Sequence, residues 1–435
     1  MANLKIDYEW VDPLGARGAE LRATWARLRI AVDDQAVTQV YDRVVKAVRD
    51  SIYLPLYPLA EWIATHWWFL LGELENPGKR VATDYDTRHC IRFGQEGYAL
   101  PPLTIRPVGT YAQLHWEPVS ARWMPLDFIG SGSRYIAVDA LAQILGEFVQ
   151  AVIARLQDQG VQSTLLEEEW VAITQSNAEE RQFALAAALL GEDAYALGDD
   201  DAARIVEVSR TIPAEALTEF LATATLGTLE ASQAAFRRSV EDAVAQQGYL
   251  RTLADIKRQL GQVHASGLPW EFGYALAQRT RSVIGLNGSP VPTDALLAGA
   301  LGVPADDYEA AIARGVEAPG VDAVVATSED DSPGFAVSAR FENAVRFSFC
   351  RGLCEYLTGQ RSSVELVTRT HSDRQKANRA FAAEFLVPAA TLRDTVTSDT
   401  VGSEEIDDLG IHFGVSPFVI YHQLENHRIA RVSVQ

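Results

Sequence analysis

The chain has 435 residues, of which 48% are hydrophobic, a composition typical of globular proteins and a length that favours two or three domains over one core. Its formal net charge of −20 opposes the general attraction to phosphate groups on which nonspecific nucleic-acid binding depends. No run of about eighteen apolar residues occurs, which argues against a membrane span.

The first residues, MANLKIDYEWVDP, contain acidic side chains early and lack the basic and then apolar pattern of a secretion signal. The three cysteines, Cys90, Cys350 and Cys354, are too few for a disulfide framework and fit a reducing compartment. We therefore expect a cytoplasmic protein.

Residues 1–137 have the pattern of an α+β domain. Strands are predicted at 26–32 and 50–59, where β-branched and aromatic residues mix with charges. Apolar residues at helical spacing predict a helix over 59–74, and its aromatic stripe is typical of a core rather than of a ligand site. Short strands with glycine turns follow over 100–137. No catalytic constellation is recognisable in this domain.

Residues 138–263 are predicted to be helical. A long amphipathic helix begins at Val138, because apolar residues recur there at every third or fourth position. The shorter helices expected after it cover 177–191, 200–210, 213–225 and 228–246. Helical segments of this kind usually pack against a partner domain or another subunit, so we expect an interaction role for this part.

The segment HASGLPW, 264–270, contains a glycine and a proline and predicts a boundary before a third domain, 270–435. In that domain two helices precede VDAVVAT (321–327) and GFAVSAR (334–340), which predict a β-hairpin around the turn-rich SEDDSP. The predicted fold is therefore α+β: a mostly helical chain with an N-terminal α+β domain, a helical middle, and a C-terminal domain of helices and a small β-sheet.

Arg346–Pro388 carries the most specific pattern in the chain: RFSFCRGLCEYLTG, a short polar interval, and HSDRQKANRAFAAEFLVP. It resembles the ImmA/IrrE-type metallopeptidase family, in which an Arg-Phe-Ser/Thr entry leads into a helix carrying HExxH and the following helix reads roughly ExxANxFAxxLLxP. The positions that keep this pattern are Arg346, Phe347, Ser348, Ala377, Asn378, Phe381, Ala382, Ala383, Leu386 and Pro388. The resemblance covers about 270–432 and implies a zincin-like fold for the C-terminal domain.

An HExxH zinc site needs two histidines one helical turn apart, a glutamate base between them and a third ligand from another helix. In the gapless alignment that the resemblance gives, the histidine positions hold Arg351 and Glu355, and the third-ligand position holds Arg374. The base position holds Gly352, the motif reads RGLCE, and HExxH occurs nowhere else. We therefore expect no zinc, no other cofactor and no peptide hydrolysis.

The replacing residues predict a salt-bridge cluster in the place of zinc. Arg351 and Glu355 lie four residues apart on one helix face and are expected to pair, while Arg374 approaches from the next helix. The retained residues of the second helix are expected to hold the fold. Among them, Asn378 is expected to bond buried backbone near the helix crossing, and Pro388 to end the helix.

An alternative metal site stays open. With a one-residue shift, Cys350 and Cys354 fall on the histidine positions and form with His371 a soft Cys-Cys-His zinc site. The shift needs a gap in a clean alignment and leaves Arg351 where the base belongs. The simpler interpretation is that both cysteines are small core residues.

Residues 403–428 imitate a helix-turn-helix, with a short helix from Ser403, a turn at 414–416 and a second helix. The side chains that would then reach base edges are His422, Gln423, Asn426 and Arg428. The net negative charge of the chain opposes DNA binding. The resembled family also carries a helical extension at this place, so the helices alone do not indicate DNA binding.

The leading hypothesis is a catalytically inactive, metallopeptidase-like protein that binds a protein partner and acts as a regulatory or sensor module, with oligomer formation open. The resemblance implies bacterial settings such as stress response, mobile-element control or phage defence. One alternative is an active metallo-endopeptidase that cleaves a regulator. A second is a hydrolase that uses His371 with Asp373, or Glu384 near Glu355. A third is a DNA-binding transcriptional regulator built on 403–428.

Overall fold

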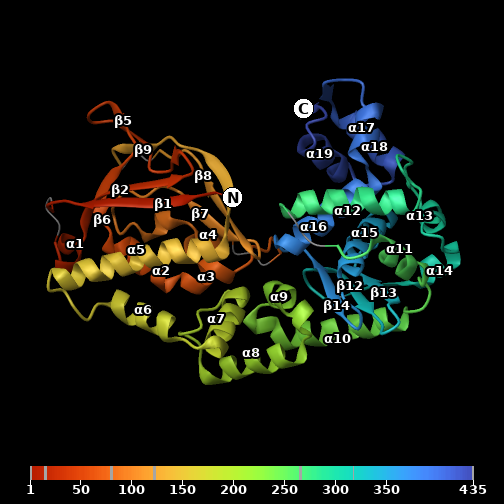
Figure 1. The fold of residues 1–435 in the computed structure, drawn as a ribbon, viewed down its shortest axis with the longest axis horizontal. Coiled ribbons are helices and arrows are strands. Elements are labelled where there is room, and N and C mark those ends of the chain that lie inside the picture. The colour runs from red at the N-terminus through yellow and green to blue at the C-terminus, as the bar shows by residue number, and fades with distance from the viewer. Residues whose placement is uncertain are drawn as a thin grey trace. The chain divides into compact units, whose positions relative to one another are not determined.

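The computed structural model describes residues 2–13, 17–78, 82–120, 124–263, 267–316 and 318–433. Its fold is α+β, rich in helices and with small sheets, as predicted (Figure 1). None of the helices in the described ranges has the length and the apolar surface that a bilayer crossing requires.

The chain divides into two compact units, Met1–Val206 and Glu207–Gln435. The division falls within α8 (Asp199–Thr211), so the helices expected to form a middle domain are shared between the two units. Residues 264–266, at the second expected boundary, lie outside the described residues.

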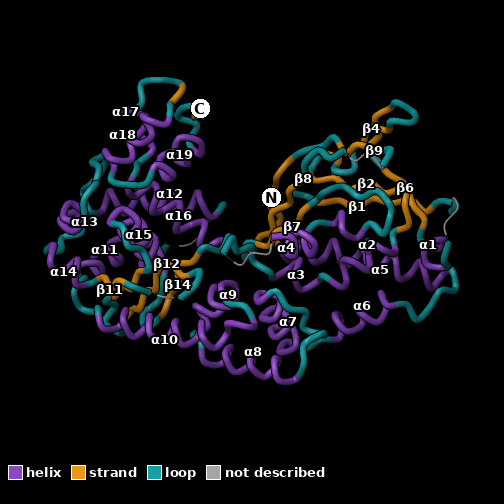
Figure 2. The backbone as a smooth tube through the Cα atoms, turned by 180° about the vertical axis from the view of Figure 1, so that it is seen from behind, coloured by secondary structure: helices purple, strands orange, loops and turns teal. Residues whose placement is uncertain are grey.

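The first unit packs three antiparallel sheets and several helices around one apolar core (Figure 2). The strands are β1 (Leu4–Trp10), β2 (Trp25–Val32), β3 (Gln35–Ala36), β4 (Val40–Asp42), β5 (Ala47–Arg49), β6 (Ile52–Pro55), β7 (Thr104–Pro107), β8 (Tyr111–Trp116), β9 (Leu126–Phe128) and β10 (Gly132–Ala137). The helices are α1 (Ala19–Ala23), α2 (Tyr57–Thr65), α3 (Trp67–Gly72), α4 (Ala82–His89), the short 3-10 helix Ile91–Gly94, α5 (Val138–Asp158), α6 (Leu165–Gln175) and α7 (Ala178–Leu190). The predicted start of the long helix at Val138 is confirmed.

The single helix predicted over 59–74 is two helices that meet at His66, whose backbone is not helical. The Thr65 hydroxyl and His66 Nδ1 both bond the carbonyl of Trp62, at 3.1 and 2.8 Å. Such side-chain bonds compete with the backbone ladder and explain the break. Trp62 and Trp67 are buried members of the core, as the aromatic stripe predicted.

The second unit is organised around a four-stranded sheet of order β11-β13-β12-β14. Its strands are β11 (Ile312–Arg314), β12 (Val321–Thr327), β13 (Pro333–Val337) and β14 (Val364–Thr368), with β15 (Thr400–Val401) and β16 (Arg431–Val432) forming a separate pair. Its helices are α9 (Ala214–Thr223), the 3-10 helix Leu226–Thr228, α10 (Leu229–Ala245), α11 (Thr252–Leu260), α12 (Pro269–Val283), α13 (Asp294–Ala300), α14 (Ala305–Ala310), α15 (Glu342–Thr358), α16 (Asp373–Leu386), α17 (Ala389–Thr395), α18 (Ser403–Phe413) and α19 (Pro417–Asn426). The predicted antiparallel hairpin of β12 and β13 is confirmed.

The four-stranded sheet has helices on both faces. Neighbouring residues of a strand point to opposite faces, and on β13 Phe335 packs near Gly352 of α15, whereas Gly334 touches the backbone of Ala243 on α10. α15 therefore covers one face and α10 the other (Figure 1). The β14 strand, VELVT, was not predicted, because it lies in the interval that looked merely polar.

The α12 and α16 helices of the second unit cross closely at Gly273. A Cβ atom at Gly273 would lie 2.2 Å from the carbonyl oxygen of Ala377 and 2.9 Å from Cβ of Ala380. The crossing therefore depends on a residue without a side chain. It fixes the position of α16, which carries Arg374 and Asn378.

We expect Gly273→Ala to lower the free energy of unfolding by about 3 kcal/mol, because backbone must move to admit the methyl group. Urea unfolding followed by circular dichroism measures the difference. Gly227→Ala is the control, since a Cβ there meets nothing within 4 Å. Equal stability of the two variants would contradict the prediction.

Candidate functional site

The three side chains aligned with the zinc ligands come together where α15 crosses α16. Arg351 and Glu355 lie on α15, one turn apart, and Arg374 lies in the first turn of α16. Ser372 precedes α16 and its hydroxyl accepts the Gln375 N–H at 3.3 Å, which is the usual N-cap of a helix. The α16 helix ends at Leu386, and Pro388 then precedes α17.

The Arg351 guanidinium is buried, and all three of its nitrogens donate hydrogen bonds. Nη1 donates to Asp322 Oδ2 at 2.7 Å, and Nε donates to Asn378 Oδ1 at 2.8 Å. Nη2 donates to the Thr368 carbonyl at 2.6 Å and to Gln375 Oε1 at 2.8 Å. Its carboxylate partner is thus Asp322 on β12, a residue that sequence reasoning did not single out.

Glu355 and Arg374 form the other half of the network. Arg374 Nη2 donates to Glu355 Oε2 at 2.7 Å and also to Glu365, while its Nη1 donates to the Glu215 carbonyl at 2.7 Å. Asn378 Nδ2 donates to Glu355 Oε1 at 2.6 Å. These carboxylates of α15 and β14 therefore hold Arg374 against the sheet.

Asn378 joins the two halves. Its oxygen accepts from Arg351 and its amide nitrogen donates to Glu355, so these two residues are linked through Asn378, where the sequence predicted a direct pair. Its bonds are to side chains rather than to the buried backbone that we expected. A polar network that satisfies its buried groups in this way fixes one packing arrangement.

The charges of the network shift several pKa values. Burial lowers the pKa of Arg351, and burial together with the Arg351 charge lowers the pKa of Arg379 to about 9. Burial opposes ionisation of Arg374, but Glu355 and Glu365 outweigh it and raise its pKa. Burial raises the pKa of Glu365 to about 7, with Arg374 acting in the opposite direction.

Glu365 should make stability depend on pH. Its pKa is higher in the folded state than the ordinary 4.5, so between about pH 4.5 and 7 the folded state binds more protons than the unfolded state. Its contribution to the free energy of unfolding therefore falls as pH rises through that window, by about 1–3 kcal/mol.

We expect Glu365→Gln to remove this part of the pH dependence, since a glutamine cannot titrate. Urea unfolding of both proteins at pH 5, 6, 7 and 8 gives the difference in stability at each pH, which cancels the groups that the two proteins share. The free energy of unfolding of the variant, relative to that of the parent, should increase as pH rises. A constant difference over the range would show that Glu365 keeps an ordinary pKa.

Gly352, which the resemblance aligns with the family's catalytic base, faces the sheet. A Cβ atom there would lie 3.0 Å from Val325 Cγ2 and 3.1 Å from the Phe335 ring. The side chain of a general base needs space and access to water, and this position offers neither.

The outer edge of β14 is occupied by side chains. β14 is the last strand of its sheet, and Gln375 bonds its backbone twice: Nε2 donates to the Leu366 carbonyl and Oε1 accepts the Thr368 N–H, each at 2.8 Å. The Thr368 carbonyl accepts from Arg351. Exposed sheet edges are where extended peptides add as a further strand, and this stretch of the edge is already satisfied.

Glu219 of α9 is a buried carboxylate held by hydroxyl groups. Its Oε2 atom accepts from Thr368 at 2.7 Å and from Thr370 at 2.6 Å, and its Oε1 atom accepts from Ser372. α9 is thereby attached to the segment between β14 and α16. Nothing in the α9 sequence pattern marked Glu219 as different from other acidic residues on a helix.

The alternative zinc residues do not form a metal site in the described part of the chain. Cys350 and Cys354 are buried in the apolar core, and burial raises the pKa of both thiols. His371 is half-buried at the start of the α16 segment. Among the described residues, no group of three His, Cys, Asp or Glu side chains has the arrangement that would hold a metal ion.

Glu384, invoked for an alternative hydrolase, belongs to a second buried network. Its oxygens accept from Gln278 at 2.9 Å, from the Ala389 N–H at 3.2 Å and from Gln423 at 3.2 Å. Gln423 also donates to the Val387 carbonyl at 2.7 Å. Gln423 therefore lies in the core and not on a base-reading surface, which corrects one of the four DNA contacts expected from the sequence.

The retained entry residues are structural in this arrangement. Arg346 Nε donates to Asp294 Oδ1 at 2.8 Å and Nη1 to the Gly414 carbonyl at 2.6 Å, so it ties α15 to α13 and to the turn before α19. Phe347 packs partly buried against the core, and Phe381 is buried with its ring stacked 5.5 Å from that of Phe385.

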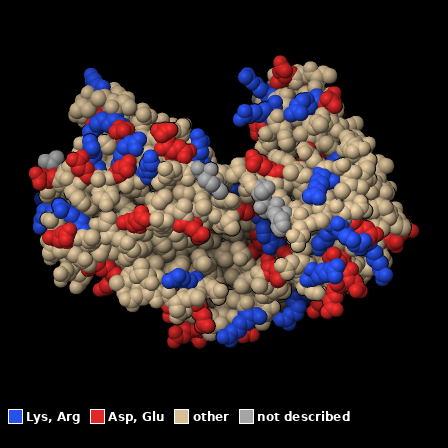
Figure 3. Space-filling model, viewed as in Figure 1, with Lys and Arg blue, Asp and Glu red and all other residues tan. Residues whose placement is uncertain are grey.

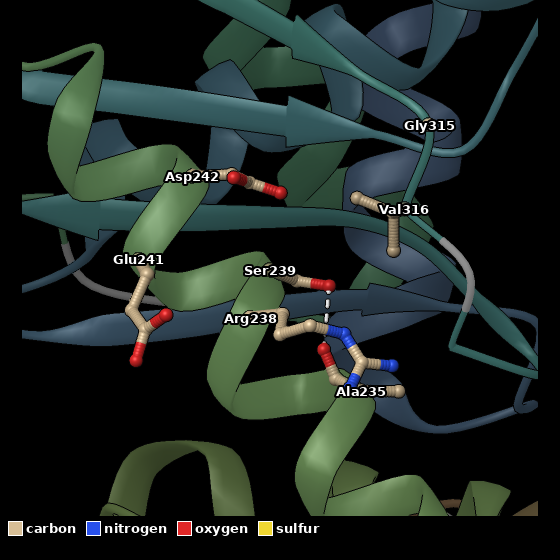
Figure 4. Close-up of a pocket in the computed structure, with 7 residues that line it drawn as sticks. All are labelled: Ala235, Arg238, Ser239, Glu241, Asp242, Gly315 and Val316. Atoms are coloured by element: carbon tan, nitrogen blue, oxygen red, sulfur yellow. Dashed lines mark hydrogen bonds between the residues drawn. The ribbon is translucent and has the colours of Figure 1, made fainter.

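A small pocket lies at α10, the helix on the sheet face opposite to α15 (Figure 4). Its volume is about 250 Å³. The residues that line it are Ala235, Arg238, Ser239, Glu241, Asp242, Gly315 and Val316. Most belong to α10, and none belongs to the charge network of α15 and α16. Charges of both signs surround it, and acidic and basic side chains are likewise interspersed over the face that Figure 3 shows.

No protein-family model, curated protein or solved structure matches this chain. The resemblance to the ImmA/IrrE-type family therefore rests on the residues quoted from Arg346 to Pro388 and on the order of elements around them.

Proposed function

We propose that the chain is a non-catalytic, metallopeptidase-like protein of the cytoplasm that works as a regulatory or sensor module by binding a protein partner. The observation that carries this proposal is the buried network of Arg351, Asn378, Glu355 and Arg374. Guanidinium groups donate hydrogen bonds and cannot act as metal ligands, so the network has the wrong chemistry for zinc and the right chemistry for a fixed scaffold.

Two further features support the proposal. Gly352 leaves no space for a general base, and Gln375 occupies the β14 edge at which an extended substrate would pair. The setting in stress response, mobile-element control or phage defence follows from the family resemblance alone and is part of the proposal.

Metal analysis tests the proposal on the purified full-length chain. We expect far less than one zinc per chain by mass spectrometry of the elements, and no change of melting temperature when a chelator is added, because no metal holds the fold. We also expect no chelator-sensitive cleavage of an unstructured protein substrate. Stoichiometric zinc together with chelator-sensitive cleavage would refute the proposal and favour the active peptidase.

A single variant separates a structural from a catalytic role of the network. In a hydrolase built on these residues, Glu355→Gln would abolish cleavage while retaining most of the fold. In the proposed protein, it changes only stability, because Glu355 contacts Arg374 and Asn378 rather than substrate. Measuring the melting temperature and cleavage of the same preparation distinguishes the two.

A further inference from the structure

The hairpin of β4 and β5 presents apolar side chains to solvent in the first unit. Val44 is 75% exposed, Val45 62% and Val48 58%, and β5 is the edge strand of the order β5-β4-β9. Val44 and Val45 lie in the turn and Val48 on β5, so the hairpin carries exposed apolar side chains of the kind that mark an interaction surface.

Hydrogen bonds within the hairpin fix its turn. Asp42 Oδ1 accepts the N–H of Val44 at 2.9 Å and of Val45 at 3.2 Å, and its other oxygen bonds Arg49, so the turn is fixed internally. Lys46 is exposed beside the valines, while the nearby Arg43 pairs with Asp127 at 3.6 Å. The tip therefore combines exposed apolar side chains with the positive charge of Lys46, in a chain whose net charge is −20.

The α18 and α19 helices of the second unit present the complementary surface. Ile411 is 78% exposed and Phe418 69%, and they flank the turn whose Gly414 is held by Arg346. The Phe418 ring lies edge-on to His422, with centroids 4.2 Å apart. The exposed acidic side chains around this pair are Glu404, Asp407, Asp408 and Glu425, and the exposed basic ones are Arg428 and Arg431.

We propose that the β4–β5 hairpin of one chain docks on the α18–α19 surface of a second copy of this chain. Apolar groups would meet apolar groups, and Lys46 would face the acids of α18, which gives the charge complementarity that orients protein contacts. Both surfaces belong to one chain and are thus always present in equal amounts. The contact is heterologous, because the two surfaces differ. This inference goes beyond the proposed function and does not depend on it.

Two variants and their mixture test the docking. Val44→Asp with Val45→Asp blocks the hairpin, and Ile411→Asp with Phe418→Asp blocks the helix surface; all four side chains are exposed, so both proteins should fold. Sedimentation velocity at up to about 100 µM is expected to show association of the parent chain and monomers of each variant. The equal mixture should form a dimer and nothing larger, because one intact hairpin meets one intact helix surface.

Charge reversal adds a specific check. Lys46→Glu should weaken association about tenfold, and Asp407→Lys with Asp408→Lys should restore it when combined with Lys46→Glu. Circular dichroism of every variant confirms the fold. A parent chain that stays monomeric at about 100 µM overturns the proposal, as does a mixture that stays monomeric while the parent associates. Association of the helix-blocked variant alone would show a hairpin-to-hairpin contact instead.

Discussion

Arg351→Met is expected to lower the free energy of unfolding by about 3–5 kcal/mol, because it removes the buried guanidinium of an ion pair and leaves Asp322 Oδ2 and the Asn378 oxygen without their donor. The buried Thr368 carbonyl loses a donor as well. Chemical unfolding at neutral pH measures the loss. Methionine keeps most of the volume, so the cavity contribution stays small.

Arg369→Met is the matched control. Arg369 donates to the same carboxylate, Asp322 Oδ1, at 3.1 Å, but its side chain is 65% exposed. An exposed ion pair contributes about 1 kcal/mol or less, since water replaces the lost partner. If both variants lost the same stability, burial of the Arg351 guanidinium would not be the source of the effect.

Gly352→Glu, the substitution that would return a base to the motif, should unfold or severely destabilise the protein, by about 4 kcal/mol or more, rather than create activity. The new side chain would be forced against Val325 and Phe335, and its charge would lie in an apolar layer without a partner. Thermal unfolding and the yield of folded protein measure the effect.

The control for this substitution is Gly299→Glu. Gly299 lies in α13, is exposed, and a Cβ there meets nothing within 4 Å. The same chemical change should therefore alter stability by less than about 1 kcal/mol. A stable Gly352→Glu protein with new metal-dependent cleavage would show that the helix can move away from the sheet and that the site is recoverable.

Most helices could be predicted from the sequence because their apolar spacing is local information. The predicted helices at 177–191, 200–210, 213–225 and 228–246 correspond to α7 to α10 with shifts of one or two residues. β14 could not be predicted in the same way, because its five residues include Glu365. That glutamate is buried, and Arg374, from another element, pairs with it.

The sequence predicted which residues of α15 and α16 meet at the candidate site, but not which partners they bond. The helical spacing brings Arg351 and Glu355 to one face, and the second helix supplies Arg374, as expected. Their partners Asp322 and Glu365 come from strands. Spacing along one helix carries no information about neighbouring strands. It therefore favours the i,i+4 pair, whereas in the structure Arg351 pairs with Asp322 and Glu355 pairs with Arg374.

Because the Gln375 side chain accepts the Thr368 N–H, the exchange of this one backbone hydrogen depends on whether α16 is in place. The Thr368 N–H is held by a side chain of α16 and not by a neighbouring strand. Its exchange with heavy water should therefore follow the detachment of α16, while amides paired between β12 and β14 follow the opening of the sheet. Comparing these amides by hydrogen exchange would reveal in which order the second unit comes apart, and whether a bound partner slows the first of those steps.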